Sequence, residues 1–208
     1  MNALALAWIA SPDDPAIANA RPMDEPVAPD DARLVAAVLG GDDSAFAALV
    51  SRHKRRVFST ASRFARDEHQ LDDIAQEVFL RAFRNLAQYR GDAPFEHWLS
   101  RITVSACYDF LRKERKIREQ ISLDGAEWDI RDETVENAVS AGRARELLAW
   151  ALHRLSADEQ LILTLCELEE RPVREVAELT GWSESNVKVR AFRARQNLKK
   201  VLETSHER

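Results

Sequence analysis

The chain has 208 residues, 45% of them apolar, which is enough for one large or two small domains with hydrophobic cores. Five of its seven prolines precede residue 31, and the rest is rich in Ala, Leu, Arg and Glu, so we expect an all-α fold of two small helical domains. The formal net charge is −5, which taken alone argues against a partner as anionic as DNA.

Residues 1–30 are predicted to form a disordered N-terminal tail. The segment MNALALAWIA is apolar, but no Lys or Arg precedes it, it is too short to span a bilayer, and it runs into a stretch rich in Pro and Asp. A degenerate signal sequence is the alternative interpretation. We expect no membrane insertion, because no other segment approaches the apolar length of a membrane span.

A first helical domain is predicted over residues 31–118. A short helix ends at Gly40 and Gly41, and Asp43 or Ser44 should cap the longer helix that follows. Apolar residues then recur at steps of three and four, which predicts an amphipathic helix of about five turns. Its buried stripe should be Leu71, Ile74, Ala75, Val78, Phe79, Ala82, Phe83, Leu86 and Tyr89.

The opposite face of that helix is charged, with Leu80 isolated among the polar side chains. An apolar side chain inside a charged rim is typical of a surface that binds a protein partner. The alternative is a solvated face with one stray leucine. The polar residues of this face are Asp72, Asp73, Gln76, Glu77, Arg81 and Arg84.

Residues 119–139 are predicted to be a flexible acidic linker, because the segment ISLDGAEWDIRDETVENAV holds six acidic residues, one Arg and little periodicity. A second helical domain should occupy residues 140–208. Ser156 and Glu159 form a capping-box pattern at the start of one of its helices. That helix should bury Leu161, Ile162, Leu165 and Leu168.

Residues 173–192 have the spacing of a helix-turn-helix. Counting from Val173, Ala177 is fifth, where the two helices cross; Gly181 is ninth, where the turn favours positive φ; and Val187 is fifteenth, where an apolar side chain is buried. A solvated basic end of a helical bundle would explain the charge of this segment but not these three positions. The buried stripe of the second helix should be Val187, Ala191, Ala194, Leu198 and Val201.

The charges are unevenly distributed along the chain. Residues 98–120 carry six basic and three acidic side chains, and residues 171–208 carry nine basic and five acidic ones. Two separated basic segments in an acidic protein suggest contact with nucleic acid at two points.

Two groups of motifs, in the expected order, resemble the extracytoplasmic function (ECF) sigma factors of the sigma-70 family. Residues 43–102, with the motif RGDAPFEHW, and the following YDFLRK are similar to region 2 of that family, and residues 155–202 are similar to region 4. The resemblance implies a bacterial initiation factor, not an enzyme, that binds core RNA polymerase, recognises the minus-35 and minus-10 promoter elements and helps to melt the promoter. It also implies an anti-sigma factor as a further partner, and no small-molecule substrate.

The resemblance assigns roles to three sets of residues. The set expected to contact core polymerase is Asp72, Asp73, Gln76, Glu77, Leu80 and Arg81. The set expected at the minus-10 element and in melting is Arg90, Asp92, Phe95, Trp98, Ser105, Asp109, Arg112 and Lys113. The set expected at the minus-35 element is Arg171, Ser183, Glu184, Ser185, Asn186, Lys188, Val189, Arg190 and Arg193.

Three features leave these roles open in part. Phe95 and Trp98 are three residues apart and could equally be core residues instead of the walls of a pocket for a flipped base. Ser105 stands where the family usually has Asn and has less hydrogen-bonding reach, so the minus-10 preference can differ from the common pattern. Ser156 with Ala157 replaces a typical Leu-Pro pair, but the capping box should start that helix anyway.

Two other classes of protein compete with this interpretation. A stand-alone helix-turn-helix regulator would bind duplex DNA as a dimer, but it has no use for the RGDAPFEHW loop beside a basic helix. A protein-binding adaptor would keep the helices but would not need Lys188, Arg190 and Arg193 to face outward.

We expect no catalytic residues, metal site or cofactor. Cys107 and Cys166 lie far apart without a partner at ligand spacing, which also favours a reducing, cytoplasmic location, and the sequence has no GxxxxGK phosphate loop. Surface or capping roles are expected for His53, His69, His97, His153 and His206.

Overall fold

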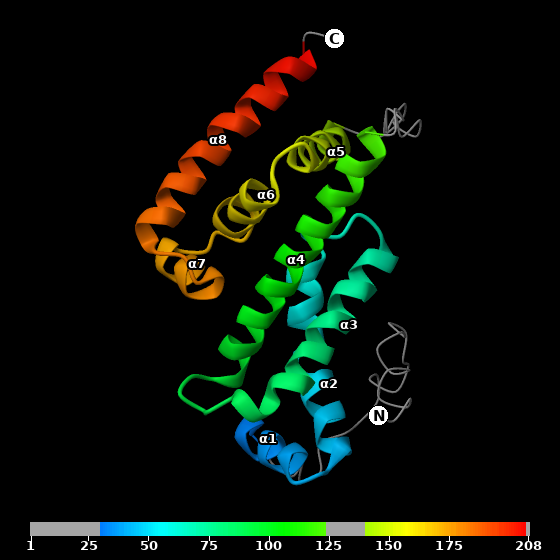
Figure 1. Cartoon of the computed structure of the whole chain (residues 1–208), viewed down its shortest axis with the longest axis vertical. Coiled ribbons are helices and arrows are strands. Elements are labelled where there is room, and N and C mark those ends of the chain that lie inside the picture. The colour runs from blue at the N-terminus through cyan, green and yellow to red at the C-terminus, as the bar shows by residue number, and fades with distance from the viewer. Residues whose placement is uncertain (1–29, 124–139, 207–208) are drawn as a thin grey trace. The chain divides into compact units, whose positions relative to one another are not determined.

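The computed structural model describes residues 30–123 and 140–206, and every regular element in these ranges is a helix (Figure 1). The all-α prediction is therefore confirmed for the described residues. Almost all of the predicted tail, and residues 124–139 of the predicted linker, lie outside them. None of the helices described is long and apolar enough to cross a membrane.

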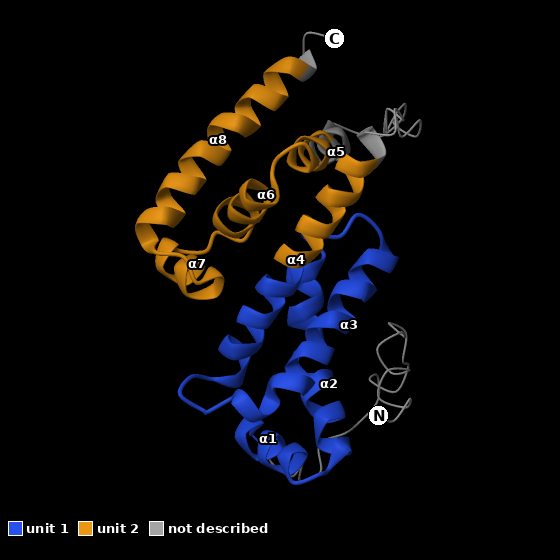
Figure 2. Ribbon diagram, viewed as in Figure 1, with its two compact units in different colours: residues 1–107 blue, residues 108–208 orange. Residues whose placement is uncertain are grey.

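The chain divides into two compact units, residues 1–107 and 108–208 (Figure 2). The boundary falls within helix α4, which continues to Leu123 and thus into the segment expected to be linker. Unit 1 holds the first part of α4 and four further elements. They are α1 (Asp31–Leu39), α2 (Asp43–Ala61), α3 (Glu68–Asn85) and the short 3-10 helix η3 (Leu86–Gln88), and α4 itself is Phe95–Leu123.

Aspartates begin the first three helices of unit 1. The carboxylate of Asp30 accepts a hydrogen bond from the backbone N–H of Arg33 at 2.9 Å, and Asp67 does the same for Gln70 at 2.8 Å. Asp42 accepts from the backbone N–H of Ser44 at 3.0 Å and begins α2. The predicted cap at Asp43 or Ser44 is therefore wrong, because Asp42, directly after the two glycines, has the extended backbone that a capping residue needs.

The buried stripe of α3 is confirmed in most positions. Ile74, Ala75, Val78, Phe79, Ala82 and Leu86 are each at most 4% exposed. Phe83 differs from the prediction, because it is 40% exposed. Its ring makes an edge-to-face contact with Phe46 of α2, at 4.9 Å between ring centroids. It lies at the margin of the stripe, where periodicity alone does not say how far the neighbouring helix reaches.

His53 is buried, which corrects the expected surface role of this residue. It is 6% exposed, and its Nε2 lies 3.1 Å from Oδ2 of Asp31 on α1, whose other carboxylate oxygen accepts from Arg52 at 2.6 Å. The signal was in the sequence: His53 falls four residues after Leu49 and four before Val57, both of which are buried.

Unit 2 holds the rest of α4 and the C-terminal helices. In this unit α8 packs against both α6 and α7, and Leu161, Ile162, Leu165 and Val187 are each at most 1% exposed. The fourth predicted core residue of this segment, Leu168, is half-buried and is the last residue of a π-helix turn that follows α6. The elements are α5 (Ser140–His153), α6 (Ala157–Leu163), the π-helix η4 (Thr164–Leu168), α7 (Val173–Thr180) and α8 (Glu184–His206).

The capping box at the start of α6 is confirmed. The hydroxyl of Ser156 accepts from the backbone N–H of Glu159, and the Glu159 carboxylate accepts from the backbone N–H of Ser156 at 2.9 Å. Burial opposes ionisation of Glu159, but hydrogen bonds from Ser156 and Asn197 outweigh it and lower the pKa of this carboxyl. The ionised carboxylate therefore stabilises the folded state.

Replacing Ser156 by Ala is expected to lower the free energy of unfolding by about 1 kcal/mol, because the first turn of α6 loses its cap. A group with a lowered pKa stabilises above its ordinary value of 4.5 and ceases to do so as the pH falls through the lower value of the folded state. Urea unfolding from pH 7 to pH 3 should therefore show the difference between variant and wild type shrinking at acid pH. An equal difference at every pH would contradict this account.

Candidate functional site

The turn between α7 and α8 sets the direction of α8. Gly181 has φ +75°, and its N–H donates to the carbonyl of Ala177 at 2.9 Å. The positive φ expected at this glycine is found, and so is the burial of Val187, which is 0% exposed. Ser183 accepts from the backbone N–H of Asn186 at 3.3 Å and begins the next helix. A side chain at position 181 would adopt a strained conformation, which explains the glycine.

The outward face of α8 presents polar, basic and apolar side chains together. Lys188 and Arg193 are exposed, and neither forms an ion pair within the described part of the chain. Val189 is 48% exposed and Phe192 is 61% exposed between them. Phe192 was not among the predicted contacts, although its position three residues after Val189 places it on the same face. The other exposed members of the predicted set are Ser183, Glu184, Ser185 and Asn186.

Two arginines of the predicted minus-35 set, both half-buried, pair with carboxylates of the protein. Arg171 donates to Glu169 at 2.5 Å and also pairs with Glu175. Burial opposes its charge, but these two carboxylates raise the pKa of its guanidinium. Arg190 is half-buried and pairs with Asp158 of α6. Both remain predicted minus-35 contacts, but carboxylates within the protein already pair with their charges.

The first five residues of the RGDAPFEHW segment lie in the loop between η3 and α4, and its last four begin α4. An aromatic cluster lies beside this loop. The Tyr89 hydroxyl donates to the carbonyl of Ala93 at 2.8 Å and so ties the two ends of the loop together. The ring of Tyr89 lies 5.5 Å from that of Phe95 and 5.6 Å from that of Trp98, between centroids. Burial, with the nearby carboxylates of Asp31 and Asp92, raises the pKa of Tyr89, which keeps its hydroxyl a donor.

The two aromatic residues of the loop motif have different surroundings. Phe95 is 3% exposed and packs 5.2 Å from the His53 ring, so it belongs to the core of unit 1. Trp98 is half-buried and retains accessible ring surface. Arg90 and Asp92 are exposed. Sequence reasoning missed Tyr89, although it directly precedes the motif.

Four further predicted residues follow along one side of α4. Ser105, Asp109 and Arg112 recur at steps of four and three, Lys113 follows Arg112, and all four are exposed. Arg112 also lies 5.7 Å from the Tyr108 ring centroid. This spacing gives α4 a row of exposed polar side chains whose last two members, Arg112 and Lys113, are cations.

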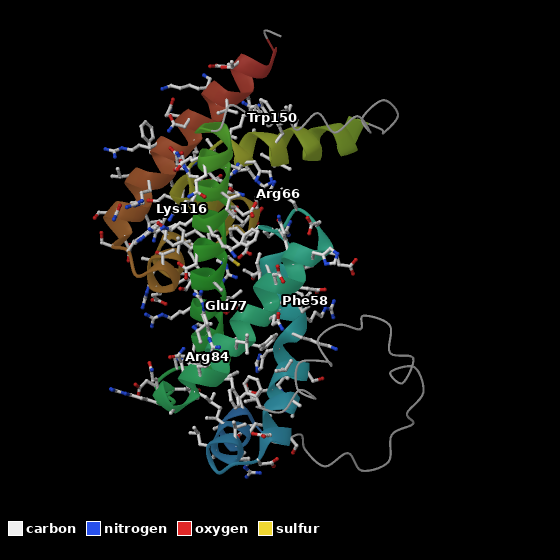
Figure 3. The ribbon with its side chains drawn as sticks, turned by 45° about the vertical axis from the view of Figure 1, so that its right-hand side comes forward. Phe58, Arg66, Glu77, Arg84, Lys116 and Trp150 are labelled. Carbon is white, nitrogen blue, oxygen red and sulfur yellow. The ribbon has the colours of Figure 1, made fainter. Side chains whose placement is uncertain are left out.

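The predicted partner-binding face of α3 is accessible. Asp73 and Gln76 are exposed, and Asp72, Glu77, Leu80 and Arg81 are half-buried. Arg81 donates to Glu77 at 2.6 Å one turn away. Glu77, in the middle of this surface, and Arg84, which follows it on α3, are labelled in Figure 3. Leu80 thus lies within a rim of charged side chains.

No cluster of three His, Cys, Asp or Glu side chains that could hold a metal ion occurs among the described residues. Cys107 is buried and Cys166 is half-buried, and neither is in a disulfide. Burial and the charge of Glu167 raise the pKa of the Cys166 thiol, which makes it unreactive.

Two family models match the chain. Residues 49–117 match Sigma-70 region 2, and residues 145–198 match Sigma-70, region 4. The chain is 31% identical over 181 residues to the ECF RNA polymerase sigma-E factor of Haemophilus influenzae, covering 83% of this chain and 95% of the relative. It is 33% identical over 174 residues to the ECF RNA polymerase sigma factor SigM of Mycobacterium tuberculosis, covering 83% and 84%.

Two solved structures have similar folds. CnrH, in complex with the cytosolic domain of CnrY, is 25% identical and superposes with a TM-score of 0.54 over 84% of this chain and 97% of that one. The sigma factor RpoE of Bartonella quintana, in complex with the anti-sigma factor NepR, is 20% identical with a TM-score of 0.52, over 76% and 96%.

Proposed function

This chain belongs to the ECF RNA polymerase sigma factors of the sigma-70 family, which are initiation factors and not enzymes, and we propose that it contacts its promoter at two separate places. Residues 31–118 act as a region 2 domain at the minus-10 element, and residues 140–208 act as a region 4 domain at the minus-35 element. The acidic segment 119–139 links them. A stand-alone regulator is no longer needed as an explanation, because the family accounts for both regions. The bacterial cytoplasm, where polymerase and DNA occur, is the proposed location.

The minus-35 contact rests on the geometry of α7 and α8. We interpret residues 173–192 as a helix-turn-helix whose second helix enters the major groove. The observation that carries this is the exposure of Lys188 and Arg193 without an acidic partner in the described residues, on the helix that follows the Gly181 turn. Open cations on one helix face suit phosphates and base edges.

The minus-10 contact rests on the loop that precedes α4. Trp98 offers partly exposed ring surface on which an unstacked base can stack, and Arg90 and Asp92 offer charged groups for its edge and backbone. Tyr89 packs against Phe95 and hydrogen-bonds the loop at Ala93, which holds the loop in place. The exposed Ser105, Asp109, Arg112 and Lys113 continue the contact along α4.

Replacing Trp98 by Ala is expected to reduce promoter opening about tenfold or more, because base–aromatic stacking contributes about 1–3 kcal/mol per base. Permanganate reactivity of minus-10 thymines in the complex with polymerase measures the open fraction. Trp150→Ala is the matched control, since Trp150 of α5, labelled in Figure 3, stacks with Arg154, which follows that helix, and neither residue belongs to a proposed contact set. Trp98→Phe keeps a stacking surface and should restore most of the opening. Equal opening by wild type and Trp98→Ala would contradict the role.

Core RNA polymerase is proposed to bind the α3 face that contains Leu80. The same sigma factor is also proposed to have an anti-sigma partner, since CnrH was solved with a protein bound. Such a partner would cover exposed apolar side chains, for example Val189 and Phe192. Co-purification from cells should recover this partner under conditions in which transcription is low. Recovery of polymerase alone under all conditions would count against it.

A further inference from the structure

Four side chains form a cluster where α8 begins. The Nε of Arg190 donates to Oδ1 of Asn186 at 2.8 Å, one turn earlier on α8. Its Nη1 pairs with Oδ2 of Asp158 on α6, and its guanidinium carbon lies 4.3 Å from the ring centroid of Trp182. The guanidinium is therefore held by an amide, a carboxylate and an aromatic face at once.

The cluster fixes Arg190 in one place. A guanidinium is planar, so a carboxylate at its end, an acceptor at Nε and a ring against its face together restrict both its position and its tilt. The side chains of Arg190 and Asp158 are 33% and 36% exposed, which screens the pair less than a fully exposed one. Lys188 and Arg193 on the same helix have no such partners within the described ranges.

Arg190 in turn orients the amide of Asn186. Only the carbonyl oxygen of an Asn side chain can accept a hydrogen bond from Nε–H, since the amide nitrogen carries two donors. With Oδ1 occupied by Arg190, the Nδ2 group is left to point away from it. Asn186 is exposed, so its Nδ2 group is available as a donor, while Arg190 occupies one of the two lone pairs of Oδ1 and turns that oxygen toward the guanidinium.

An amide whose oxygen is turned toward Arg190 distinguishes between bases in the major groove. Asn recognises adenine by donating to N7 and accepting from N6, which needs the amide oxygen. Guanine offers two acceptors, O6 and N7, and thymine offers O4. Against adenine, the donor of Asn186 can still bond N7, but its oxygen, turned toward Arg190, is not placed to accept from N6, so only one of the two contacts forms.

We propose that Asp158 and Trp182 hold Arg190 so that Asn186 presents its amide as a donor, and that Asn186 thereby selects guanine or thymine over adenine at one base pair of the minus-35 element. Asn186 is the specificity-determining residue, and Arg190, Asp158 and Trp182 are positioning residues. This inference rests on the proposed function, in which α8 enters the major groove. It also gives Arg190 a role other than that of a phosphate contact.

The test measures binding of the holoenzyme, assembled from the full chain and core polymerase, to promoter fragments in which each minus-35 base pair is replaced by the other three. For the wild type, one position should favour guanine or thymine over adenine by about tenfold. Asn186→Asp keeps an oxygen for Arg190 but replaces the donor by an acceptor. At that same position its preference should move to cytosine, which offers the N4 donor.

Asp158→Asn tests the positioning role separately. Removing the ion pair should reduce the affinity difference between guanine or thymine and adenine at that one base pair. The base preferences at the other base pairs should stay unchanged. Glu178→Gln is the matched control, because it removes one carboxylate that pairs with Arg174 on the exposed face of α7, outside the cluster. It should leave the preference at every position as in the wild type.

A uniform loss of affinity for all bases in Asn186→Asp would overturn the inference, as would a wild-type preference for adenine at the position affected. An Asp158→Asn variant that keeps the wild-type preference for guanine or thymine over adenine would also overturn it. In these cases binding still depends on the minus-35 sequence, so the proposed function stands. A holoenzyme that shows no minus-35 discrimination, and for which Lys188→Ala/Arg193→Ala changes nothing, would refute the proposed function itself and this inference with it.

Discussion

Replacing Leu80 by Glu is expected to raise the Kd for core RNA polymerase by about 30- to 1000-fold, which corresponds to about 2–4 kcal/mol. Leu80 is half-buried on α3, with exposed Asp73 and Gln76 and the Arg81–Glu77 pair near it. An apolar anchor inside a charged rim contributes much of an interface's free energy, and a carboxylate there would be desolvated without a partner. Titration of labelled protein with purified core polymerase measures this Kd.

Leu39→Glu provides the control for this experiment. Leu39 is 54% exposed at the end of α1, in the same unit, so the change introduces the same charge at an exposed leucine away from the α3 face. The control should bind core polymerase as the wild type does, and both variants should keep the wild-type melting temperature. An unchanged Kd in a folded Leu80→Glu protein would exclude the α3 face as the docking surface.

The double replacement Lys188→Ala/Arg193→Ala is expected to weaken promoter binding most strongly at low salt. Each phosphate contact contributes about −0.9 to the slope of log Kobs against log salt concentration, so losing two should make the slope shallower by about 1.8. If either residue reads a base instead, its share of the loss will depend on minus-35 sequence and not on salt. Binding of the holoenzyme to promoter fragments over a range of KCl concentrations separates the two.

The control is the double variant Arg33→Ala/Arg63→Ala, which removes an equal number of positive charges from exposed positions of unit 1. Because these arginines lie outside both proposed DNA contacts, the slope should remain that of the wild type. If both double variants change the slope equally, the change in slope is caused by the change in net charge and not by the loss of contacts from α8.

The helices could be predicted from sequence because their apolar periodicity is strong. The α3 stripe from Ile74 to Leu86 follows from steps of three and four, and the positive φ of Gly181 follows from its place in the turn. The capping box at Ser156 was predictable because it depends only on two residues that are three apart in the sequence. Phe83 shows the limit, since its exposure depends on how far α2 reaches over α3.

The site was harder to predict because its side chains depend on tertiary partners. Arg190 resembles Lys188 and Arg193 on a helical wheel of α8, yet a carboxylate binds it. Arg171, which lies just before α7, is likewise bound by a carboxylate. Asp158 lies far from Arg190 in the sequence, and no spacing links them. The hydrogen bond from Tyr89 to the loop likewise needs the loop conformation to be known. The net charge of −5 was misleading in the same way, because it does not show that Lys188 and Arg193 on α8 lack acidic partners among the described residues.

Run-off transcription with purified core polymerase tests the central claim most directly. Fragments of the host genome are transcribed with and without this protein, and with the Leu80→Glu and Lys188→Ala/Arg193→Ala variants. The account predicts defined transcripts only when the wild-type protein is present, none with Leu80→Glu and weaker ones with the double variant. The absence of any transcript, together with binding of duplex DNA by the protein without polymerase, would contradict it.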